Sequence, residues 1–323
     1  KLYKPNIRKA IICLHKNKNR TAMTDSKKFM VFSGTATKYL AEKICQSLGC
    51  PLGNMVMTKF SDGEFAVSYE ESIRGRDVFL IQSTFPNSDN LMELLLMIDA
   101  ANKSDRKFMV GQICRFTPAF EKAKEIIEAG TLGELYFIES EYAHDYMLIQ
   151  EPWRCDPLRH GVIGGGCHAI DLIRWLAGDP QEVFAYGTHR LLPHVTYDDA
   201  TVAIMKFNEN LMGKVFVSTG CKRDYTMRTV IYGTKGTLIC DNTSPTMTLF
   251  TVDENEVTKE AEIIEIQVNN HNAVKEFEVF ADAILNDKKV LTDATEGAKT
   301  VAVCLAIVES AKTGEKVKPN YEF

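Results

Sequence analysis

The sequence predicts two fold classes in one chain: an α/β segment containing an incomplete parallel sheet, and after it an α+β domain with a large, mostly antiparallel sheet. Three observations predict this. A length of 323 residues suits two domains that each bury a core. Up to about residue 101, apolar strand-like runs alternate with amphipathic helices. After about residue 105, strand follows strand across tight turns.

The front segment begins with a buried strand pattern, KFMVFSG, which ends at Gly34. A helix pattern follows and stops at Gly49. Two extended runs then flank an Asp-Gly turn, which is typical of a hairpin. The remaining elements are a third buried strand and a helix, in the runs RGRDVFLIQST and NLMELLLMIDA. We expect the strands to form a parallel sheet.

The back segment opens with an extended run, RKFMVGQ, and an amphipathic helix in TPAFEKAKEIIEAGTLGEL. Two further helices close the chain, and the second stops at Gly314. Between the first helix and these two, alternating patterns predict strands in ELYFIESEYAH, QEVFAYGTH, DATVAIMKF, MGKVFVSTG, TMRTVIYGTKGTLICD and PTMTLFTV.

Composition and charge exclude several functions. Residues 1–22 carry seven Lys or Arg and no acid, so the rest of the chain has a net charge of −12. Such an acidic body predicts no nucleic-acid partner. No apolar stretch is long enough to span a bilayer. The nine cysteines show neither a C-x-x-C pair nor metal-ligand spacing, which predicts reduced thiols, a cytoplasmic location and no metal site.

The runs FSGTATKYLAEKI, KFSDGEFAVSYEESIRGRDVFLIQST and DNLMELLLMIDA resemble the N-terminal part of ribose-phosphate pyrophosphokinase. The resemblance implies that Phe60, Asp62 and Glu64 help to hold an ATP adenine. An aromatic face stacks on a base and carboxylates accept hydrogen bonds from its amine. The same residues also suit any exposed Asp-Gly hairpin. The second half of that enzyme, with its metal ligands and ribose-phosphate loop, has no counterpart after Ala101.

The run PWRCDPLRHGVIGGGCHAIDLIRWLAGDP holds the candidate chemistry of the back segment. Three glycines, Gly164 to Gly166, allow close backbone approach, and a helix is predicted to begin near His168. His168 and Asp171 stand three residues apart on one helical face. A histidine at a helix start is well placed to move a proton. The alternative is a capping or core histidine.

GQICRFTPAFEKAKEIIEAGTLGEL, GGGCHAIDLIRWLAGDP and VIYGTKGTL resemble the back portion of the Gfo/Idh/MocA oxidoreductases, which use NAD(P) on sugars and polyols. The resemblance implies catalytic roles for His168 and Asp171. It assigns substrate binding to Trp153, Arg154, Gly165 and Gly166, although Arg154 also suits a rim salt bridge. It further implies a sugar or polyol substrate and a homo-oligomer that forms through the C-terminal sheet.

Two departures from the family bear on activity. Many members have an aspartate four residues before the histidine, where this chain has Gly164. The family's glycine-rich dinucleotide loop is also missing, because only Gly34 follows the first strand. The family's Glu-Lys-Pro lysine is missing as well, because no Lys-Pro follows a strand before the junction. NAD(P) is therefore implied by resemblance without an evident site.

We interpret the chain as a sugar or polyol oxidoreductase by ancestry that lacks turnover. The alternatives are a non-catalytic binding or oligomerisation protein, an artificial fusion, and a pyrophosphokinase-related protein of nucleotide biosynthesis. The predicted organisation is a basic tail at 1–22, the pyrophosphokinase-like segment at 23–104 and the oxidoreductase-like domain at 105–323. A shared β–α–β crossover near Asn90 would join the two parts.

Overall fold

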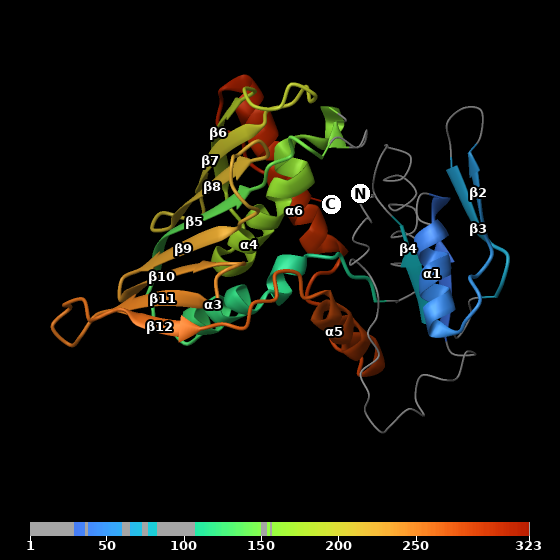
Figure 1. Cartoon of the computed structure of the whole chain (residues 1–323), viewed down its shortest axis with the longest axis horizontal. Helices are drawn as coiled ribbons and strands as arrows, with labels where there is room; N and C mark the ends of the chain where they lie inside the picture. The colour runs from blue at the N-terminus through green and yellow to red at the C-terminus, as the bar shows by residue number, and fades with distance from the viewer. Residues whose placement is uncertain are drawn as a thin grey trace, which may run out of the picture. The chain divides into compact units, whose positions relative to one another are not determined.

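The computed structural model divides the chain into two compact units (Figure 1). The first unit takes in the chain up to Phe108 together with Phe277–Val290, and the second takes in Met109–Glu276 with Leu291–Phe323. We call the second unit the sheet domain. The structure describes residues 29–35, 38–59, 65–72, 77–82, 107–149, 154–155 and 157–322.

The first unit contains a pair of parallel strands. β1 (Phe29–Ser33) pairs with β4 (Asp77–Ile81) along its whole length. The apolar run of β1 is buried, with Val31 and Phe32 at 1% and 0% exposure. The helix that follows, α1 (Lys38–Leu48), contributes apolar side chains to the same small core. The predicted fragment of parallel sheet is confirmed.

A separate hairpin in this unit joins β2 (Met55–Lys59) to β3 (Phe65–Tyr69) in antiparallel register. This pairing agrees with the hairpin expected around the Asp-Gly turn. The turn itself, with Phe60, Asp62 and Glu64, lies outside the described residues, so the predicted nucleotide contacts stay predictions.

The sheet domain is built on eight strands in the order β12-β11-β10-β9-β5-β8-β7-β6. Only β5 and β8 pair in parallel; the other neighbours are antiparallel, which confirms the predicted fold class. The strands are β5 (Leu135–Ala143), β6 (Glu182–Thr188), β7 (Ala200–Lys206), β8 (Met212–Ser218), β9 (Arg228–Gly233), β10 (Gly236–Asp241), β11 (Thr246–Thr251) and β12 (Glu262–Glu265).

Three helices cover one face of this sheet: α3 (Pro118–Glu128), α4 (Cys167–Ala177) and α6 (Ala294–Thr313) (Figure 1). A fourth helix, α5 (Ala273–Leu285), precedes α6. Buried and exposed residues alternate along β7, as expected for a sheet with one covered face.

The open face of the sheet exposes large apolar side chains on neighbouring strands. Tyr186, Ile204 and Met212 are each more than half exposed. Such a surface suits association between subunits. Homo-oligomerisation through this sheet stays a prediction.

Two expectations for the sheets were wrong or incomplete. The run Phe108–Val110 was expected to be a strand, yet it forms none. Instead the Val110 backbone N–H donates to Thr292 O at 2.7 Å, and the Thr292 hydroxyl donates to Val110 O at 2.7 Å. These bonds occupy the groups that a strand ladder would need. The edge strand β12 was not foreseen, because its mostly exposed residues show no alternation.

No helix among the described residues is both long and apolar enough to cross a bilayer.

Candidate functional site

Three ring side chains follow one another at alternate positions where β5 ends: Tyr142, His144 and Tyr146. Alternate residues of an extended chain point to the same side, so these rings gather. The Tyr142 hydroxyl lies 3.2 Å from His144 Nδ1 and 2.9 Å from the Tyr146 hydroxyl. Burial raises the pKa of Tyr142 well above its ordinary value, so the phenol keeps its proton at neutral pH.

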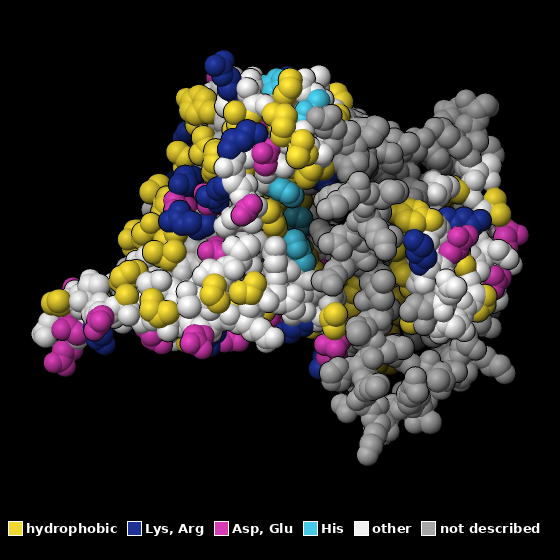
Figure 2. All heavy atoms as spheres, viewed as in Figure 1, with side chains coloured by type: hydrophobic (Ala, Val, Ile, Leu, Met, Phe, Trp, Pro, Cys, Tyr) yellow, Lys and Arg dark blue, Asp and Glu magenta, His cyan; other side chains and the backbone are white. Residues whose placement is uncertain are grey.

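Rings from two other segments complete this group. Tyr225, between β8 and β9, lies with its ring centroid 4.9 Å from that of His144. His271, just before α5, stacks on Tyr225 at 5.7 Å with 4° between the planes. We call Tyr142, His144, Tyr146, Tyr225, His271 and His168 the aromatic–histidine cluster. Figure 2 shows histidine side chains at separate places on the visible face of the larger unit.

His168 reaches this cluster from the start of α4. Its ring centroid lies 6.3 Å from that of Tyr142. The three preceding glycines form the end of a π-helical turn, Val162–Gly166, that runs directly into α4. Such turns inside helices often occur at functional sites. The three glycines are therefore helical, and α4 begins one residue before His168, as the sequence predicted.

The glycines of this turn allow close packing against the sheet. A β-carbon on Gly165 would lie 2.6 Å from Cε1 and 2.7 Å from Cζ of Tyr142. A β-carbon on Gly166 would lie 2.5 Å from Cγ2 of Val217 on β8. Both glycines are buried. They let α4 approach β5 and β8 closely enough to bring His168 beside Tyr142.

Arg154 borders the cluster on the side of Tyr146. Its guanidinium carbon lies 5.1 Å from the centre of the Tyr146 ring, a cation–π distance. The backbone oxygen of Arg154 accepts a hydrogen bond of 2.6 Å from the Tyr197 hydroxyl. Arg154 is thus placed beside the cluster, whereas Trp153 lies outside the described residues.

Asp171 makes different contacts, although it shares a helix with His168. It is fully buried and accepts two hydrogen bonds of 2.8 Å from Arg115 and one of 2.9 Å from Thr300. Arg115 also pairs with Glu296 at 3.1 Å. Arg174, Asp179 and Lys299 extend the same network through short ion pairs. The network contains three cations and three carboxylates, so it is neutral as a whole. It links α4 to α6 and to the turn Ile113–Phe116.

Glu276 is a buried acid near the start of α5. It is 7% exposed, and its Oε1 finds no hydrogen-bond donor among the described residues. A β-carbon on Gly111 would lie 3.6 Å from this oxygen. Burial raises the pKa of Glu276 to about 7.

This shift predicts a pH dependence of stability. The unperturbed pKa of Glu276 is 4.5. Its contribution to the free energy of unfolding is therefore fully present below about pH 4.5 and is lost as the pH rises through about 7. The loss is on the order of 3 kcal/mol, at about 1.4 kcal/mol per pKa unit. Urea unfolding between about pH 5 and 8 measures it, and Glu276→Gln should flatten the profile. An unchanged slope in that variant would contradict this assignment.

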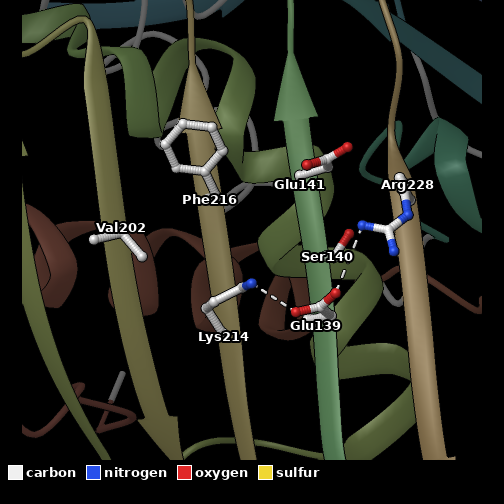
Figure 3. Close-up of a pocket in the computed structure, with 7 residues that line it drawn as sticks. All are labelled: Glu139, Ser140, Glu141, Val202, Lys214, Phe216 and Arg228. Atoms are coloured by element: carbon white, nitrogen blue, oxygen red, sulfur yellow. Dashed lines mark ion pairs between the residues drawn. The ribbon is translucent and has the colours of Figure 1, made fainter.

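Two hollows are lined by residues outside the cluster. One, of about 190 Å³, sits on the open face of the sheet between Glu139, Lys214 and Arg228 (Figure 3). Its charges are already paired, with Lys214 2.6 Å and Arg228 3.7 Å from Glu139. The other, of about 450 Å³, lies beside the β1–α1 turn and has Lys38 and Glu42 in its lining. Neither contains a histidine or cysteine.

No three His, Cys, Asp or Glu side chains converge as a metal site would require, within the part of the chain that the structure describes. The aromatic–histidine cluster gathers several groups able to move protons or bind hydroxyls. It combines imidazole and phenol groups with aromatic faces, which suits a small polar organic ligand.

Comparison with known families separates the two halves. A family model described as the N-terminal domain of ribose phosphate pyrophosphokinase matches residues 29–124. A model described as the GFO/IDH/MocA C-terminal domain matches residues 120–239. The chain is thus similar to two families in successive segments. The two matches overlap at residues 120–124, within α3, and the boundary expected at 104/105 stays a prediction.

Individual relatives agree with this division. The ribose-phosphate pyrophosphokinase of Porphyromonas gingivalis is 63% identical over 103 residues, which are 32% of this chain and 33% of that protein. The chain thus spans about a third of the length of this curated relative.

Solved oxidoreductase structures share the fold. An NAD-binding oxidoreductase from Klebsiella pneumoniae is 19% identical with a TM-score of 0.63, covering 76% of this chain and 74% of that one. Levoglucosan dehydrogenase in complex with NADH and levoglucosan is 20% identical with a TM-score of 0.60, covering 77% and 74%. At these identities the likeness concerns the fold.

In the GFO/IDH/MocA-like part, the structure brings His168 and Arg154 to the cluster and places Asp171 in the buried ion network. The roles assigned to His168, Asp171, Arg154, Gly165 and Gly166 stay predictions. Tyr142, His144 and Tyr146 were missed as site residues. Their spacing of two at the end of a predicted strand was the signal that could have found them. Tyr225 and His271 join from distant segments, and no local pattern marks them.

Proposed function

We propose that the sheet domain binds a small sugar or polyol at the aromatic–histidine cluster, and that this chain does not oxidise it. The observation that carries the proposal is the chain of contacts from Tyr146 through Tyr142 to His144, with His168 beside it. Phenol and imidazole groups both donate and accept hydrogen bonds, as hydroxyl-rich ligands require. The shared fold with levoglucosan dehydrogenase supports this ligand class.

In this proposal the residues have separate roles. His168 exchanges a hydrogen bond with a ligand hydroxyl and can accept or return its proton. Tyr142, held in its protonated form, orients His144 and Tyr146 around the ligand. Asp171 is a positioning residue, because its carboxylate is committed to Arg115 and Thr300. Arg154 closes the site at Tyr146.

The Klebsiella oxidoreductase binds NAD and levoglucosan dehydrogenase is in complex with NADH, and the front segment of this chain fits such a dinucleotide poorly. A dinucleotide cradle needs open glycines between the first strand and its helix, so that backbone can approach a pyrophosphate. Here Gly34 stands alone, and the side-chain amide of Gln82 fills the space where its β-carbon would be. The nearby hollow also presents the carboxylate of Glu42. We therefore derive no hydride step for this chain.

A binding experiment tests both parts of the proposal. Fluorescence titration with NADH and NADPH should show no saturable binding at micromolar concentrations. Calorimetry with levoglucosan and L-sorbose should detect binding of at least one sugar. Tyr142→Phe should weaken that binding about fivefold, since a buried hydrogen bond contributes about 1 kcal/mol.

The outcomes separate the alternatives. Saturable NADH binding would overturn the non-catalytic assignment and favour a working dehydrogenase. Absence of heat with every sugar would remove the ligand assignment and leave a structural or oligomerisation role. Tyr186→Phe serves as a matched control, because Tyr186 is 66% exposed and lies outside the cluster.

A further inference from the structure

The end of α1 in the first unit has a defined hydrogen-bonding pattern. Gly49 adopts a left-handed φ of +67°. Its N–H donates to Gln46 O at 3.4 Å, and the N–H of Cys50 donates to Cys45 O at 3.1 Å. These two bonds, with glycine at the left-handed position, form a Schellman motif.

This motif brings together the side chains of two particular residues. The residue after the glycine contacts the one five positions earlier, and the contact is usually apolar. In this chain both positions are cysteine. Cys45 is 3% exposed and Cys50 is half-buried, and neither is part of a disulfide. The motif directs both side chains to the same side of the helix end.

A disulfide requires α-carbons about 4.4–6.8 Å apart and side chains that face each other. The 3.1 Å backbone bond from Cys50 to Cys45 holds their main chains close, and the side-chain pairing that this motif imposes supplies the second condition. We propose that Cys45 and Cys50 form a redox-active dithiol, which closes to an intramolecular disulfide when a hydroperoxide oxidises it.

The reaction balances in two steps. The Cys50 thiolate attacks a peroxide oxygen, the O–O bond breaks, and the leaving hydroxide takes up a proton to become water. The Cys50 sulfenic acid that results is attacked by Cys45 sulfur, so the S–O bond breaks and a second water leaves with the Cys45 proton. Two thiols and one hydrogen peroxide thus give one disulfide and two waters.

Accessibility decides the order of these steps. Cys50 is the more exposed thiol and meets the peroxide first. Burial, together with the neighbouring Cys50 thiol, raises the pKa of Cys45 to about 12. Cys45 therefore stays a thiol until its partner has been oxidised. A reducing dithiol reverses the reaction by thiol–disulfide exchange.

The disulfide would fix the end of α1 beside β1. The residues that follow Cys50 are already tied to that strand, since the Gly53 N–H donates to Val31 O at 2.8 Å. A covalent link between Cys45 and Cys50 would restrict the motion of the segment between the helix end and this hydrogen bond. The oxidised form should therefore resist proteolysis in this segment better than the reduced form.

Peptide mapping of the full chain tests the proposal. Trypsin releases both cysteines in one peptide, Ile44–Lys59, because it cuts after Lys43 and Lys59. After brief treatment with hydrogen peroxide, this peptide should lose the mass of two hydrogens and take up no iodoacetamide. A reducing dithiol should restore both alkylation sites. Cutting with chymotrypsin after Leu48 should leave the two fragments linked until they are reduced.

One variant and one internal control separate a paired site from ordinary thiol oxidation. In Cys45→Ser, the Cys50 sulfenic acid has no partner and should be trapped by dimedone, whereas the unaltered chain should trap little. Cys221 is a control within the same protein, being half-buried and unbridged. Dimedone labelling of Cys50 at equal levels in both proteins, or retention of both alkylation sites after peroxide, would overturn the proposal.

Discussion

Replacing Arg115 with methionine is expected to lower the free energy of unfolding of the sheet domain by about 3–5 kcal/mol. Arg115 is 3% exposed and makes two hydrogen bonds to the carboxylate of Asp171, which is fully buried. Methionine keeps much of the volume and removes the charge. The Asp171 carboxylate would then be left in the core with Thr300 and a more distant Arg174, at 3.8 Å, as its remaining partners.

Urea unfolding followed by circular dichroism measures this loss. Arg223→Met is the matched control, because Arg223 pairs with Glu141 at a similar distance, 2.7 Å, but is 47% exposed. Exposed pairs contribute about 0–1 kcal/mol, so the control should change little. Removing both charges with Arg115→Met and Asp171→Leu should recover much of the loss, because the remaining network stays neutral. A loss below about 1 kcal/mol for Arg115→Met alone would contradict this account.

The ion network also shows where sequence reasoning stops. The resemblance to the oxidoreductases implied a catalytic role for Asp171, which shares a helical face with His168. The partner that occupies it, Arg115, stands 56 residues earlier, and Thr300 stands 129 residues later. Local spacing contains no information on pairings over such distances. The sequence therefore placed Asp171 on the correct helix without revealing its buried contacts.

Periodicity predicted the elements much better than the site. Alternation along runs such as DATVAIMKF predicted the strands of the large sheet, because one of its faces is covered and the other open. The short run Phe108–Val110 looked like a strand, yet a loop residue, Thr292, takes its hydrogen bonds. A short apolar run suits a strand and a packed loop equally well. Only its hydrogen-bond partner, which is distant in the sequence, determines which of the two forms.

Replacing Gly165 with alanine is expected to destabilise the sheet domain by about 1–3 kcal/mol and to displace Tyr142. The added β-carbon would lie 2.6 Å from the Tyr142 ring, closer than real contacts allow. Tyr142 is 5% exposed, and its hydroxyl is held by His144 and Tyr146. The ring therefore has little room to move, so the strain should disturb the whole cluster.

Gly164→Ala provides a matched comparison in the same π-helical turn. Its added carbon would lie 2.6 Å from Cγ of Arg159, a half-buried side chain whose Nη2 donates a hydrogen bond to Gly164 O. Moving Arg159 toward solvent would give up that one bond, so the expected cost is about 1 kcal/mol, at the low end of the range for Gly165→Ala. Thermal and urea unfolding compare the two variants without any ligand, and sugar calorimetry then asks whether only Gly165→Ala weakens binding. If the two variants were equally stable, the same methyl group would be tolerated at both positions of the turn. Close packing of α4 on Tyr142 would then not control the geometry of this cluster.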